Sequence, residues 1–201
     1  MNIYLIRHAQ SVTNDTWTWT GQLDVDISEK GIKQIESIKE KFTYPLGDLY
    51  ISSPLKRCTQ TMNLIYKKSP DIYIDELKEC SLGILEGQKY TDLTNDENYV
   101  KWQKYPDIPI ENGESFNQFI TRTHKGFNKI IEIAEKGNHK NIIVLMHGNV
   151  MRAILHKFVN KEISHKDWEI PNLGIYKLQV NSGRIILSTT YPDFLFNKTG
   201  H

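Results

Sequence analysis

The sequence of 201 residues lacks the marks of a membrane protein or of a disulfide-stabilised protein. Its two cysteines, Cys58 and Cys80, are too few for a disulfide framework or a four-thiolate metal site. No apolar run reaches the ~20 residues that a membrane span requires. The first strand-like run, over residues 2–6, is too short for the core of a signal peptide. These absences predict a soluble, cytoplasmic protein.

The chain also lacks an excess of charge of either sign. Lys and Arg total 25 and Asp and Glu total 24, so the formal net charge is +1. This balance argues against nucleic acid or an anionic membrane as a partner, because either usually requires a clear basic excess. There is no Asp-rich cluster and no H-E-x-x-H motif. We therefore expect neither a metal nor a cofactor.

Short apolar runs alternate with amphipathic segments, and this alternation is typical of an α/β protein. At ~100–200 residues per domain, the length predicts a single domain over residues 1–201. The pattern favours a three-layer α/β/α sandwich whose sheet is mostly parallel with an antiparallel edge. The polar, aromatic stretch over about residues 82–112 predicts a helical, lid-like insertion over one end of the sheet. The expected strands are 3–6, 49–52, 72–74, 141–146 and the hairpin 174–180 with 184–190; the expected helices are 27–42, 53–67, 114–136 and 149–159.

Chemically active residues follow the expected strands at their carboxyl ends, where open α/β sheets bind ligands. Arg7 and His8 follow the first strand, and Arg57 lies one helical turn beyond the second. Glu79 follows the third strand, and His147 follows the fourth. Several positively chargeable groups on one edge repel one another unless an anion lies between them. The sequence therefore predicts an anion site at this edge.

Phosphate is the anion that these residue types suit best. Arginine offers a rigid two-pronged donor for phosphate oxygens. Gly148 opens a helix, so its backbone N–H can donate with the helix dipole behind it. Ser11 and Asn14 are short polar residues on the loop after the first strand. No G-x-x-x-x-G-K-[ST] loop is present, so this is not a Walker-type phosphate cradle.

These residues resemble the histidine phosphatase (phosphoglycerate mutase-like) superfamily over about residues 2–180. The run LIRHAQSVTN at residues 5–14 is similar to the Arg-His-Gly signature of that family. Further similar motifs follow in the order of the family: GQLD at 21–24, SSPLKR at 52–57, LKE at 77–79, NGES at 112–115 with Arg122, and MHGN at 146–149.

The resemblance implies a mechanism and a set of site residues. His8 would attack phosphorus and form a phosphohistidine, with its other ring N–H held by a backbone carbonyl. Arg7, Arg57 and His147 would neutralise charge on the transferred group. Glu79 would serve as general acid and then as base, although Glu76 and Glu86 are nearby carboxylates. The implied substrate-binding residues are Ser11, Asn14, Thr20, Gly21, Gln22 and Gly148.

Four positions depart from the family pattern. Ala9 replaces the usual glycine, and Gln10 stands where glutamate is common. Thr18 and Cys80 stand where many members or the glycolytic mutases have arginine. A mutase needs that positive charge to hold the carboxylate of its substrate. The departures therefore favour a phosphatase over a mutase.

Three functions remain open at this point. The first is a metal-independent phosphomonoesterase acting on a small organic phosphate. Its substrate could be α-ribazole 5′-phosphate, because residues 77–122 resemble α-ribazole phosphatases. The second is a phosphoglycerate mutase, and the third is a non-catalytic module that binds a phosphorylated ligand. Trp17 and Trp19 form either an aromatic wall of the site or part of the core, and a homodimer is compatible with the sequence. The histidines outside these motifs are expected to be ordinary helix, loop or tail residues: His124, His139, His156, His165 and His201.

Overall fold

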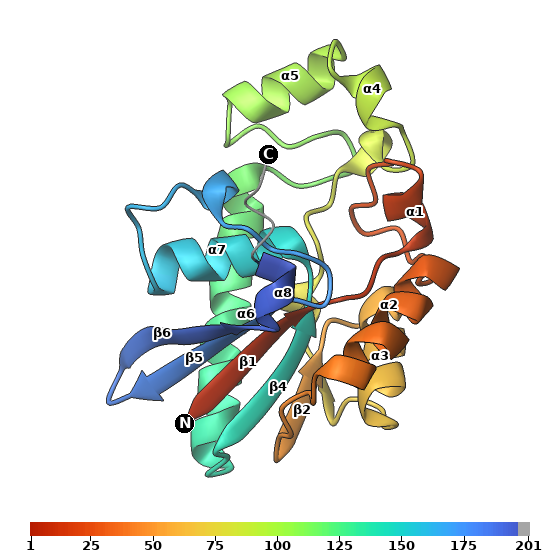
Figure 1. The fold of residues 1–201 in the computed structure, drawn as a ribbon. Coiled ribbons are helices and arrows are strands. Elements are labelled where there is room, and N and C mark those ends of the chain that lie inside the picture. Colours follow the sequence, from red (N-terminus) through yellow and green to blue (C-terminus); the bar gives the residue numbers. More distant parts are fainter. Residues whose placement is uncertain (197–201) are drawn as a thin grey trace.

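The computed structural model describes residues 1–196, which are built around a six-stranded sheet of order β3-β2-β4-β1-β5-β6 (Figure 1). Neighbouring strands from β3 to β1 are parallel, β5 runs antiparallel to β1, and β6 antiparallel to β5. The mostly parallel sheet with an antiparallel hairpin at one edge is therefore confirmed. The strands are β1 (Asn2–Arg7), β2 (Leu49–Ser52), β3 (Ile72–Tyr73), β4 (Asn141–Met146), β5 (Ile175–Asn181) and β6 (Arg184–Tyr191).

Helices cover both faces of the sheet, as the three-layer prediction requires (Figure 1). Strand β4 shows why, because its side chains alternate between two hydrophobic clusters. Ile142 and Val144 belong to the cluster that contains the buried faces of α6 and α7. Ile143 and Leu145 belong to the cluster that contains those of α2 and α3. A strand buried on both faces reads as the continuous apolar run seen in the sequence. The covering helices are α2 (Glu29–Lys41), α3 (Lys56–Tyr66), α6 (Phe116–Lys136) and α7 (Gly148–Phe158).

Side-chain caps set where these helices begin. The Ser28 hydroxyl accepts the Gly31 amide at 3.1 Å, as expected for the N-cap of α2. Ser115 and Gln118 form a reciprocal capping box, so α6 begins at Phe116 rather than at residue 114. The predicted start of the helix at residue 53 was wrong, because α3 begins at Lys56. The Ser53 hydroxyl contacts His147 Nε2 at 2.8 Å, so it hydrogen-bonds the histidine that follows β4.

The hairpin at the sheet edge turns over two residues, Ser182 and Gly183. Both have positive φ, 48° and 78°, as a tight turn between twisted antiparallel strands requires. Glycine adopts this conformation without steric cost, which is why the Asn-Ser-Gly sequence predicted the turn.

The stretch predicted as an insertion contains short helices that lie beyond the carboxyl ends of the parallel strands (Figure 1). Leu82 and Tyr90 of this stretch line the cavity of the candidate site described below. Within residues 1–196, no helix combines the length and apolar composition needed to cross a bilayer. The remaining elements are the α-helices α1 (Val12–Asp15), α4 (Tyr90–Leu93), α5 (Glu97–Lys104) and α8 (Asp193–Phe196), and the 3-10 helices η1 (Asp75–Leu77), η2 (Gly83–Leu85) and η3 (His165–Asp167).

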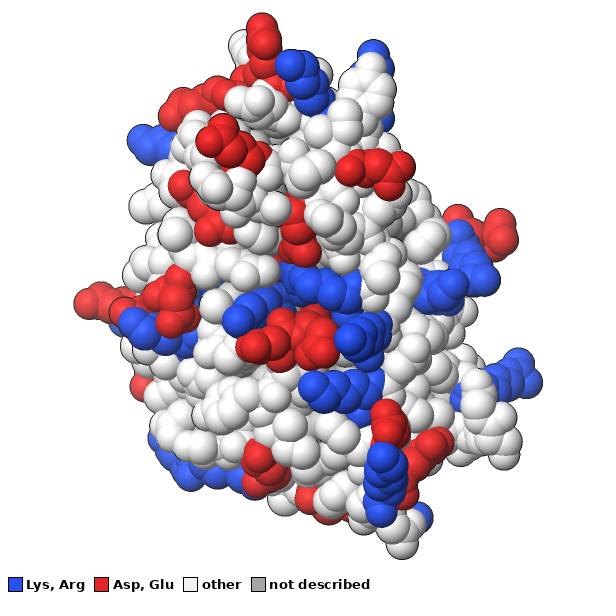
Figure 2. Space-filling view, turned by 180° about the vertical axis from the view of Figure 1, so that it is seen from behind, with Lys and Arg blue, Asp and Glu red and all other residues white. Residues whose placement is uncertain are grey.

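Acidic and basic side chains are interspersed over the face seen in Figure 2. Neither sign forms a continuous patch on that face, in keeping with the nearly neutral composition.

Candidate active site

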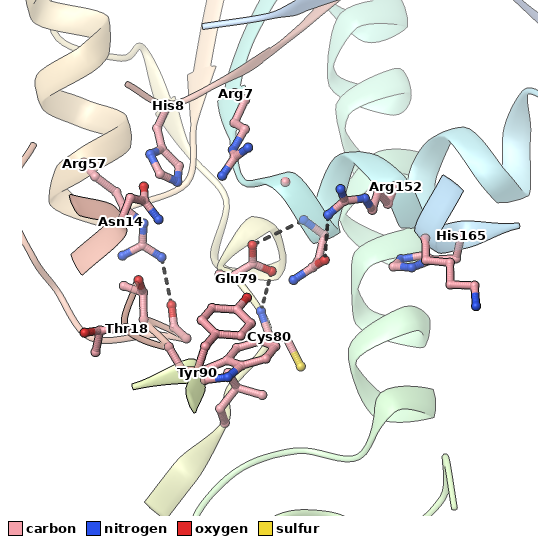
Figure 3. Close-up of a pocket in the computed structure, with 17 residues that line it drawn as sticks. Arg7, His8, Asn14, Thr18, Arg57, Glu79, Cys80, Tyr90, Arg152 and His165 are labelled. Carbon is pink, nitrogen blue, oxygen red and sulfur yellow. Dashed lines mark hydrogen bonds between the residues drawn. The ribbon is translucent and has the colours of Figure 1, made fainter. Parts of the chain in front are cut away.

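A cavity of about 360 Å³ opens at the carboxyl ends of the parallel strands; we call it the strand-end cavity (Figure 3). It brings together most of the residues singled out from the sequence, although they lie up to 141 positions apart in the chain. Three predicted residues, Ser11, Gln22 and His147, are not in its lining among the described residues. The predicted residues in its lining are Arg7, His8, Asn14, Thr20, Gly21, Arg57, Glu79 and Gly148.

His8 is held as a neutral imidazole with one ring nitrogen free. Its Nδ1 contacts the Ala9 carbonyl at 2.6 Å, which assigns the ring proton to Nδ1 and leaves Nε2 with a lone pair. Burial, followed by the charges of Arg57 and Arg7, lowers the pKa of His8 well below its usual value. Figure 3 shows the ring between the side chains of these two arginines. A histidine in this state can act as a nucleophile, and a backbone carbonyl accepts its ring proton, as the resemblance implied.

Alanine at position 9 fits its loop without backbone strain. Ala9 is fully buried and is not among the non-glycine residues with positive φ. Its amide donates to Thr61 Oγ1 at 3.0 Å, and its carbonyl accepts from His8. The position therefore needs a small side chain rather than a left-handed backbone, and alanine meets that need.

The two predicted arginines are fixed by backbone carbonyls. Arg57 donates from Nη1 to Leu23 and from Nη2 to Gly21, each at 2.8 Å. Arg7 donates from Nη1 to the Ile170 carbonyl, and its buried Nε has no partner among the described residues. Burial lowers the pKa of Arg7 to about 10, which still leaves it charged at neutral pH. Both guanidinium groups are thus held in place before any anion arrives.

Gly148 opens α7 beside the Arg7 guanidinium. A Cβ at position 148 would lie 3.4 Å from Arg7 Nε, which is ordinary van der Waals contact. Glycine is therefore not required here by space, and its contribution to the site is its backbone N–H at the start of the helix.

His147, which was expected to neutralise charge on the transferred group, lies outside the lining of the cavity. This residue is fully buried behind Arg57, and its Nδ1 accepts the Arg57 Nε proton at 3.2 Å. Its Nε2 contacts Ser53 Oγ at 2.8 Å. Burial and the charge of Arg57 lower its pKa well below the usual value, so the ring is neutral. His147 orients Arg57 and does not add a charge to the cavity wall.

Among the described residues that line the cavity, Glu79 is the one carboxylate. Its Oε1 accepts the Cys80 amide at 2.8 Å, and its Oε2 accepts the Asn149 amide, at the start of α7, at 3.3 Å. The two nearby carboxylates have other partners. Glu86 accepts the Gln22 and Leu82 amides, and Glu76 pairs with Lys129 at 3.6 Å. The geometry therefore favours Glu79 over both alternatives as the acid.

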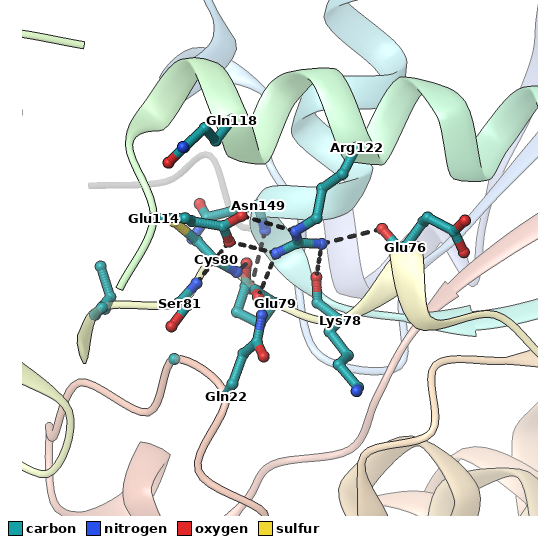
Figure 4. Close-up of polar contacts among 12 residues, drawn as sticks. Gln22, Glu76, Lys78, Glu79, Cys80, Ser81, Glu114, Gln118, Arg122 and Asn149 are labelled. Carbon is teal, nitrogen blue, oxygen red and sulfur yellow. Dashed lines mark hydrogen bonds and ion pairs between the residues drawn. The ribbon is translucent and has the colours of Figure 1, made fainter. Parts of the chain in front are cut away.

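An ion pair between Glu114 and Arg122 of α6 holds the segment that carries Glu79 (Figure 4). Arg122 binds the Glu114 carboxylate through Nε at 2.8 Å and through Nη2. The same guanidinium donates to the carbonyls of Glu76, Lys78 and Glu79 at 3.0, 2.7 and 2.7 Å. Three carbonyls of a short loop are thus bound to one rigid group on a long helix.

Gln22 and Ser11, which were predicted to bind substrate, form hydrogen bonds to other residues around the cavity. Gln22 donates from Nε2 to the Glu79 carbonyl at 3.0 Å, so it braces the acid-bearing loop. Ser11 donates from its amide and its hydroxyl to Asn14 Oδ1 at 3.1 and 3.0 Å. With its oxygen occupied, Asn14 has its amide NH₂ available as the donor toward the cavity it lines.

Trp17 and Trp19 have different environments. Trp17 is 77% exposed, whereas Trp19 lines the cavity and stacks on Tyr90 with ring centroids 4.2 Å apart. The aromatic-wall alternative therefore holds for Trp19 and not for Trp17.

Further lining residues escaped the sequence analysis. Arg152 lies one helical turn beyond Gly148 on α7, a spacing that places both on one face and could have revealed it. It donates to the Trp168 carbonyl and to Asn149 Oδ1. His165 was expected to be an ordinary residue, but it lines the cavity from η3. No strand end or motif pointed to it. Thr18, Trp19 and Cys80, which the sequence analysis named for other reasons, also line the cavity. The other additional lining residues are Leu82, Tyr90, Asn149, Arg152, His165 and Lys166. His201, also expected to be an ordinary residue, lies outside the described residues.

The family model of the histidine phosphatase superfamily (branch 1) matches residues 3–191. The chain belongs to this superfamily. It is 27% identical over 173 residues to phosphoserine phosphatase 1 of Hydrogenobacter thermophilus, covering 84% of this chain and 80% of that protein. The assignment confirms the resemblance stated from the motifs and supports a phosphatase enzyme.

Solved structures share the fold over nearly the whole chain. The α-ribazole phosphatase from Shigella flexneri has a TM-score of 0.80 at 22% identity, covering 96% of each chain. The phosphoglycerate mutase from Bacillus anthracis has a TM-score of 0.77 at 19% identity, covering 94% of this chain and 92% of that one. The predicted phosphoglycerate mutase-like fold is therefore confirmed.

Proposed function

We propose that the protein is a metal-independent phosphomonoesterase that hydrolyses a small organic phosphate through a phosphohistidine at His8. The observation that carries this proposal is the state of His8. A neutral imidazole with its proton on Nδ1 lies between Arg7 and Arg57, which line the same cavity. This combination supplies a nucleophile and the charge needed to hold phosphate beside it.

In the first step, the lone pair of His8 Nε2 attacks phosphorus as the P–O bond to the leaving alcohol breaks. Arg7 and Arg57 neutralise charge on the phosphoryl oxygens, and Glu79 gives its carboxyl proton to the leaving oxygen. In the second step, water attacks phosphorus and gives a proton to the Glu79 carboxylate. The P–N bond breaks and its electron pair returns to Nε2, which leaves inorganic phosphate and the starting enzyme.

The lining of the cavity favours hydrolysis over a mutase reaction. Thr18 and Cys80 both line it, and they stand where the family resemblance places arginines in many members or in the mutases. The non-catalytic alternative is disfavoured by the neutral state of His8 and by the orientation of Glu79, since a module that merely binds phosphate needs neither.

The finer part of the proposal is that α-ribazole 5′-phosphate is a substrate. It is supported by the resemblance of residues 77–122 to α-ribazole phosphatases and by the fold shared with the Shigella flexneri enzyme of that name.

The test is an acid-quench experiment with a ³²P-labelled ester. We expect acid-labile phosphate on the wild-type protein and none on His8→Ala, with turnover lower by at least about 10³-fold. His139→Ala is the matched control, because His139 precedes β4 at the other end of the sheet. Activity in His8→Ala close to that of the wild type would overturn the proposal. A bisphosphoglycerate donor distinguishes the mutase, which would transfer phosphate to a phosphoglycerate instead of releasing it.

A further inference from the structure

Tyr90, the first residue of α4, is the one tyrosine among the described residues that line the strand-end cavity. Figure 3 shows its hydroxyl directed toward Glu79, on the side of the cavity opposite His8. No hydrogen bond joins this hydroxyl to the other residues drawn there. The hydroxyl is therefore available to a molecule in the cavity, and neither step of the proposed reaction has yet used it.

Charged groups of the cavity act on the Tyr90 hydroxyl. Burial raises the pKa of Tyr90, and the charge of Glu79 also raises it, whereas Arg152 and Arg7 oppose the rise. The hydroxyl therefore keeps its proton at neutral pH. Because a neutral phenol can accept a hydrogen bond as well as donate one, Tyr90 can serve as an acceptor close to the carboxylate.

The backbone at Tyr90 is tied to the loop that carries Trp19. The Trp19 amide donates to the Gln88 carbonyl at 2.9 Å, and the Trp19 carbonyl accepts the Gly87 amide at 2.8 Å. The Tyr90 amide donates to the Trp17 carbonyl at 3.0 Å. These bonds between two segments far apart in the sequence fix where α4 begins, and with it the base of the Tyr90 side chain.

The ring of Tyr90 is held by stacking. It lies on the Trp19 indole with ring centroids 4.2 Å apart and an angle of 26° between the planes. Aromatic pairs prefer a small set of stacked and edge-on arrangements, so this contact restricts the direction in which the hydroxyl points.

Trp19 also lines a second cavity, of about 240 Å³, which we call the aromatic compartment. Its aromatic rings come from the Trp19 loop, from α5 and from the start of α6. The aromatic lining residues are Trp19, Tyr99, Trp102, Phe116 and Phe119. The wall that the two cavities have in common is made of Trp19, Cys80, Leu82, Asn149, His165 and Lys166.

The rings of the aromatic compartment support Trp19 and, through it, Tyr90. Tyr99 lies 5.5 Å from Trp19 and 6.4 Å from Trp102, between ring centroids. Phe116 continues the series, with its centroid 6.4 Å from that of Trp102. Tyr90 itself lines the strand-end cavity and not the compartment. A series of packed rings thus ends on a hydroxyl that faces the site of reaction.

We infer that the Tyr90 hydroxyl orients the water that attacks the phosphohistidine. This inference rests on the proposed function and adds a residue to its second step. In an in-line transfer the attacking water lies opposite His8, at the position that the leaving oxygen occupied before. One hydrogen of this water goes to the Glu79 carboxylate. The other is donated to the Tyr90 oxygen as a hydrogen bond and stays on the water oxygen, which becomes part of the released phosphate. Tyr90 keeps its own proton throughout.

Tyr90→Phe tests this role, because it removes the hydroxyl and keeps the ring that stacks on Trp19. Acid-quench experiments with ³²P-labelled p-nitrophenyl phosphate measure the formation and the hydrolysis of the phosphohistidine separately. We expect the rate constant of hydrolysis to fall by about 10-fold, the loss of one hydrogen bond. The rate constant of formation should stay within about 2-fold of the wild type, since nitrophenolate leaves without help. Tyr105→Phe is the matched control, an exposed tyrosine next to α5 that lines neither cavity.

Orthovanadate gives a second readout that does not depend on turnover. When it binds to a histidine it takes five ligands, and its apical oxygen lies where the attacking water would lie. Tyr90→Phe should weaken calorimetric binding of vanadate by about 10-fold. The affinity for inorganic phosphate, which is tetrahedral and has no such oxygen, should be unchanged, and this also shows that the variant is folded.

The outcomes separate failure of the inference from failure of the proposed function. If the wild type forms and hydrolyses a phosphohistidine, and Tyr90→Phe changes neither its hydrolysis nor the affinity for vanadate, the role of Tyr90 is wrong and the function stands. Equal losses in formation and hydrolysis would also overturn the inference, because Tyr90 would then only shape the cavity. If the wild type forms no phosphohistidine, the proposed function and the inference fail together.

Discussion

The strand-end cavity and the aromatic compartment share a wall but are built on different principles. The strand-end cavity takes Arg7 from the end of β1 and His8 from the next residue, and it takes Arg57 and Arg152 from α3 and α7. Its carboxylate, Glu79, comes from the loop after η1. These groups therefore meet at the carboxyl ends of the parallel strands. The aromatic compartment takes its rings from a loop, from the short helix α5 and from the start of α6. In the first, backbone carbonyls hold the guanidinium groups of Arg7 and Arg57, and we propose that it binds phosphate. The second takes two of its rings from α5, within the stretch predicted as an insertion.

The largest expected effect within this comparison is that of Glu79→Gln. A poor leaving group needs a proton as its bond to phosphorus breaks, so turnover of alkyl phosphates should fall by about 10²–10⁴-fold. Formation of the phosphohistidine from p-nitrophenyl phosphate should fall less, because nitrophenolate leaves without help. A burst of nitrophenol followed by a stall, with phosphohistidine accumulating, is the expected stopped-flow result. Equal losses on both esters, with no burst, would assign the acid role to another carboxylate.

The loss in Glu79→Gln depends on the pKa of the leaving alcohol and not on whether that alcohol carries an aromatic ring. Glu79→Gln should lower adenosine 5′-monophosphate and ribose 5-phosphate turnover by the same factor, because both leave as alkoxides. A loss confined to the ring-bearing ester would contradict this dependence on the leaving alcohol.

The difference between the two regions also explains what the sequence could predict. Arg7, His8, Glu79 and Gly148 were predicted because motifs at strand ends report both chemistry and position. For His147 the motif predicted a position at a strand end but not its hydrogen bond with Arg57. It also did not predict the burial that, together with the charge of Arg57, lowers the pKa of its ring. That contact depends on packing between α3 and β4.

The compartment could not be predicted in the same way. Tyr99 and Trp102 lie in the stretch predicted as a lid-like insertion, and only tertiary packing brings their rings to Trp19 and Phe116. His165 reaches the cavity from a connection after α7, and no periodic pattern relates that connection to β1. Arg152 was not predicted, but it could have been, because its spacing of one helical turn from Gly148 is visible in the sequence.

The second prediction concerns Arg122, which touches neither cavity. Arg122→Ala should lower kcat on alkyl phosphates by about 10-fold, because the loop that carries Glu79 loses three carbonyl contacts and the Glu114 pair. KM should change little, since the arginines of the cavity are untouched. Arg122→Lys should not restore the rate, because an ammonium cannot reproduce the planar fork. If Arg122 acts by positioning Glu79, the rate with p-nitrophenyl phosphate should fall less than the rate with alkyl phosphates, as in Glu79→Gln. A uniform loss that tracks thermal stability would make Arg122 a purely structural residue.

The third prediction follows from the lowered pKa values of the buried histidines. Protonated His8 cannot attack, and its pKa lies well below 6.5, so the acid limb that His8 imposes on kcat/KM should lie below pH 6.5. Arg57→Gln removes one cause of the lowering and should shift this limb to higher pH on the same substrate. The shift should be equal for esters with and without a ring, because it arises in the strand-end cavity.

Stability should follow the same titration. The unfolded chain protonates His8 and His147 near pH 6.5, whereas the folded chain does not until the pH is well below that. The unfolded state therefore binds more protons as the pH falls, and the free energy of unfolding decreases by about 1 kcal/mol per histidine between pH 6.5 and 5.5. Urea denaturation at the two pH values measures this, and an unchanged midpoint would contradict it.

The smallest expected effect on activity is that of Ala9→Gly, which restores the residue usual in the family. Because Ala9 does not have positive φ, glycine relieves no strain, and kcat/KM should stay within about 2-fold of the wild type. Stability should fall by about 1–2 kcal/mol, from the lost burial of a methyl group and the greater backbone freedom of the unfolded chain. Gly31→Ala provides the contrast in the same region, since its Cβ would lie 2.3 Å from the Gln10 carbonyl oxygen and would displace the loop. A gain in kcat above about 10-fold in Ala9→Gly would contradict this expectation. It would show that alanine holds the His8 loop away from its reactive position, so that the geometry of the strand-end cavity changes with this one residue.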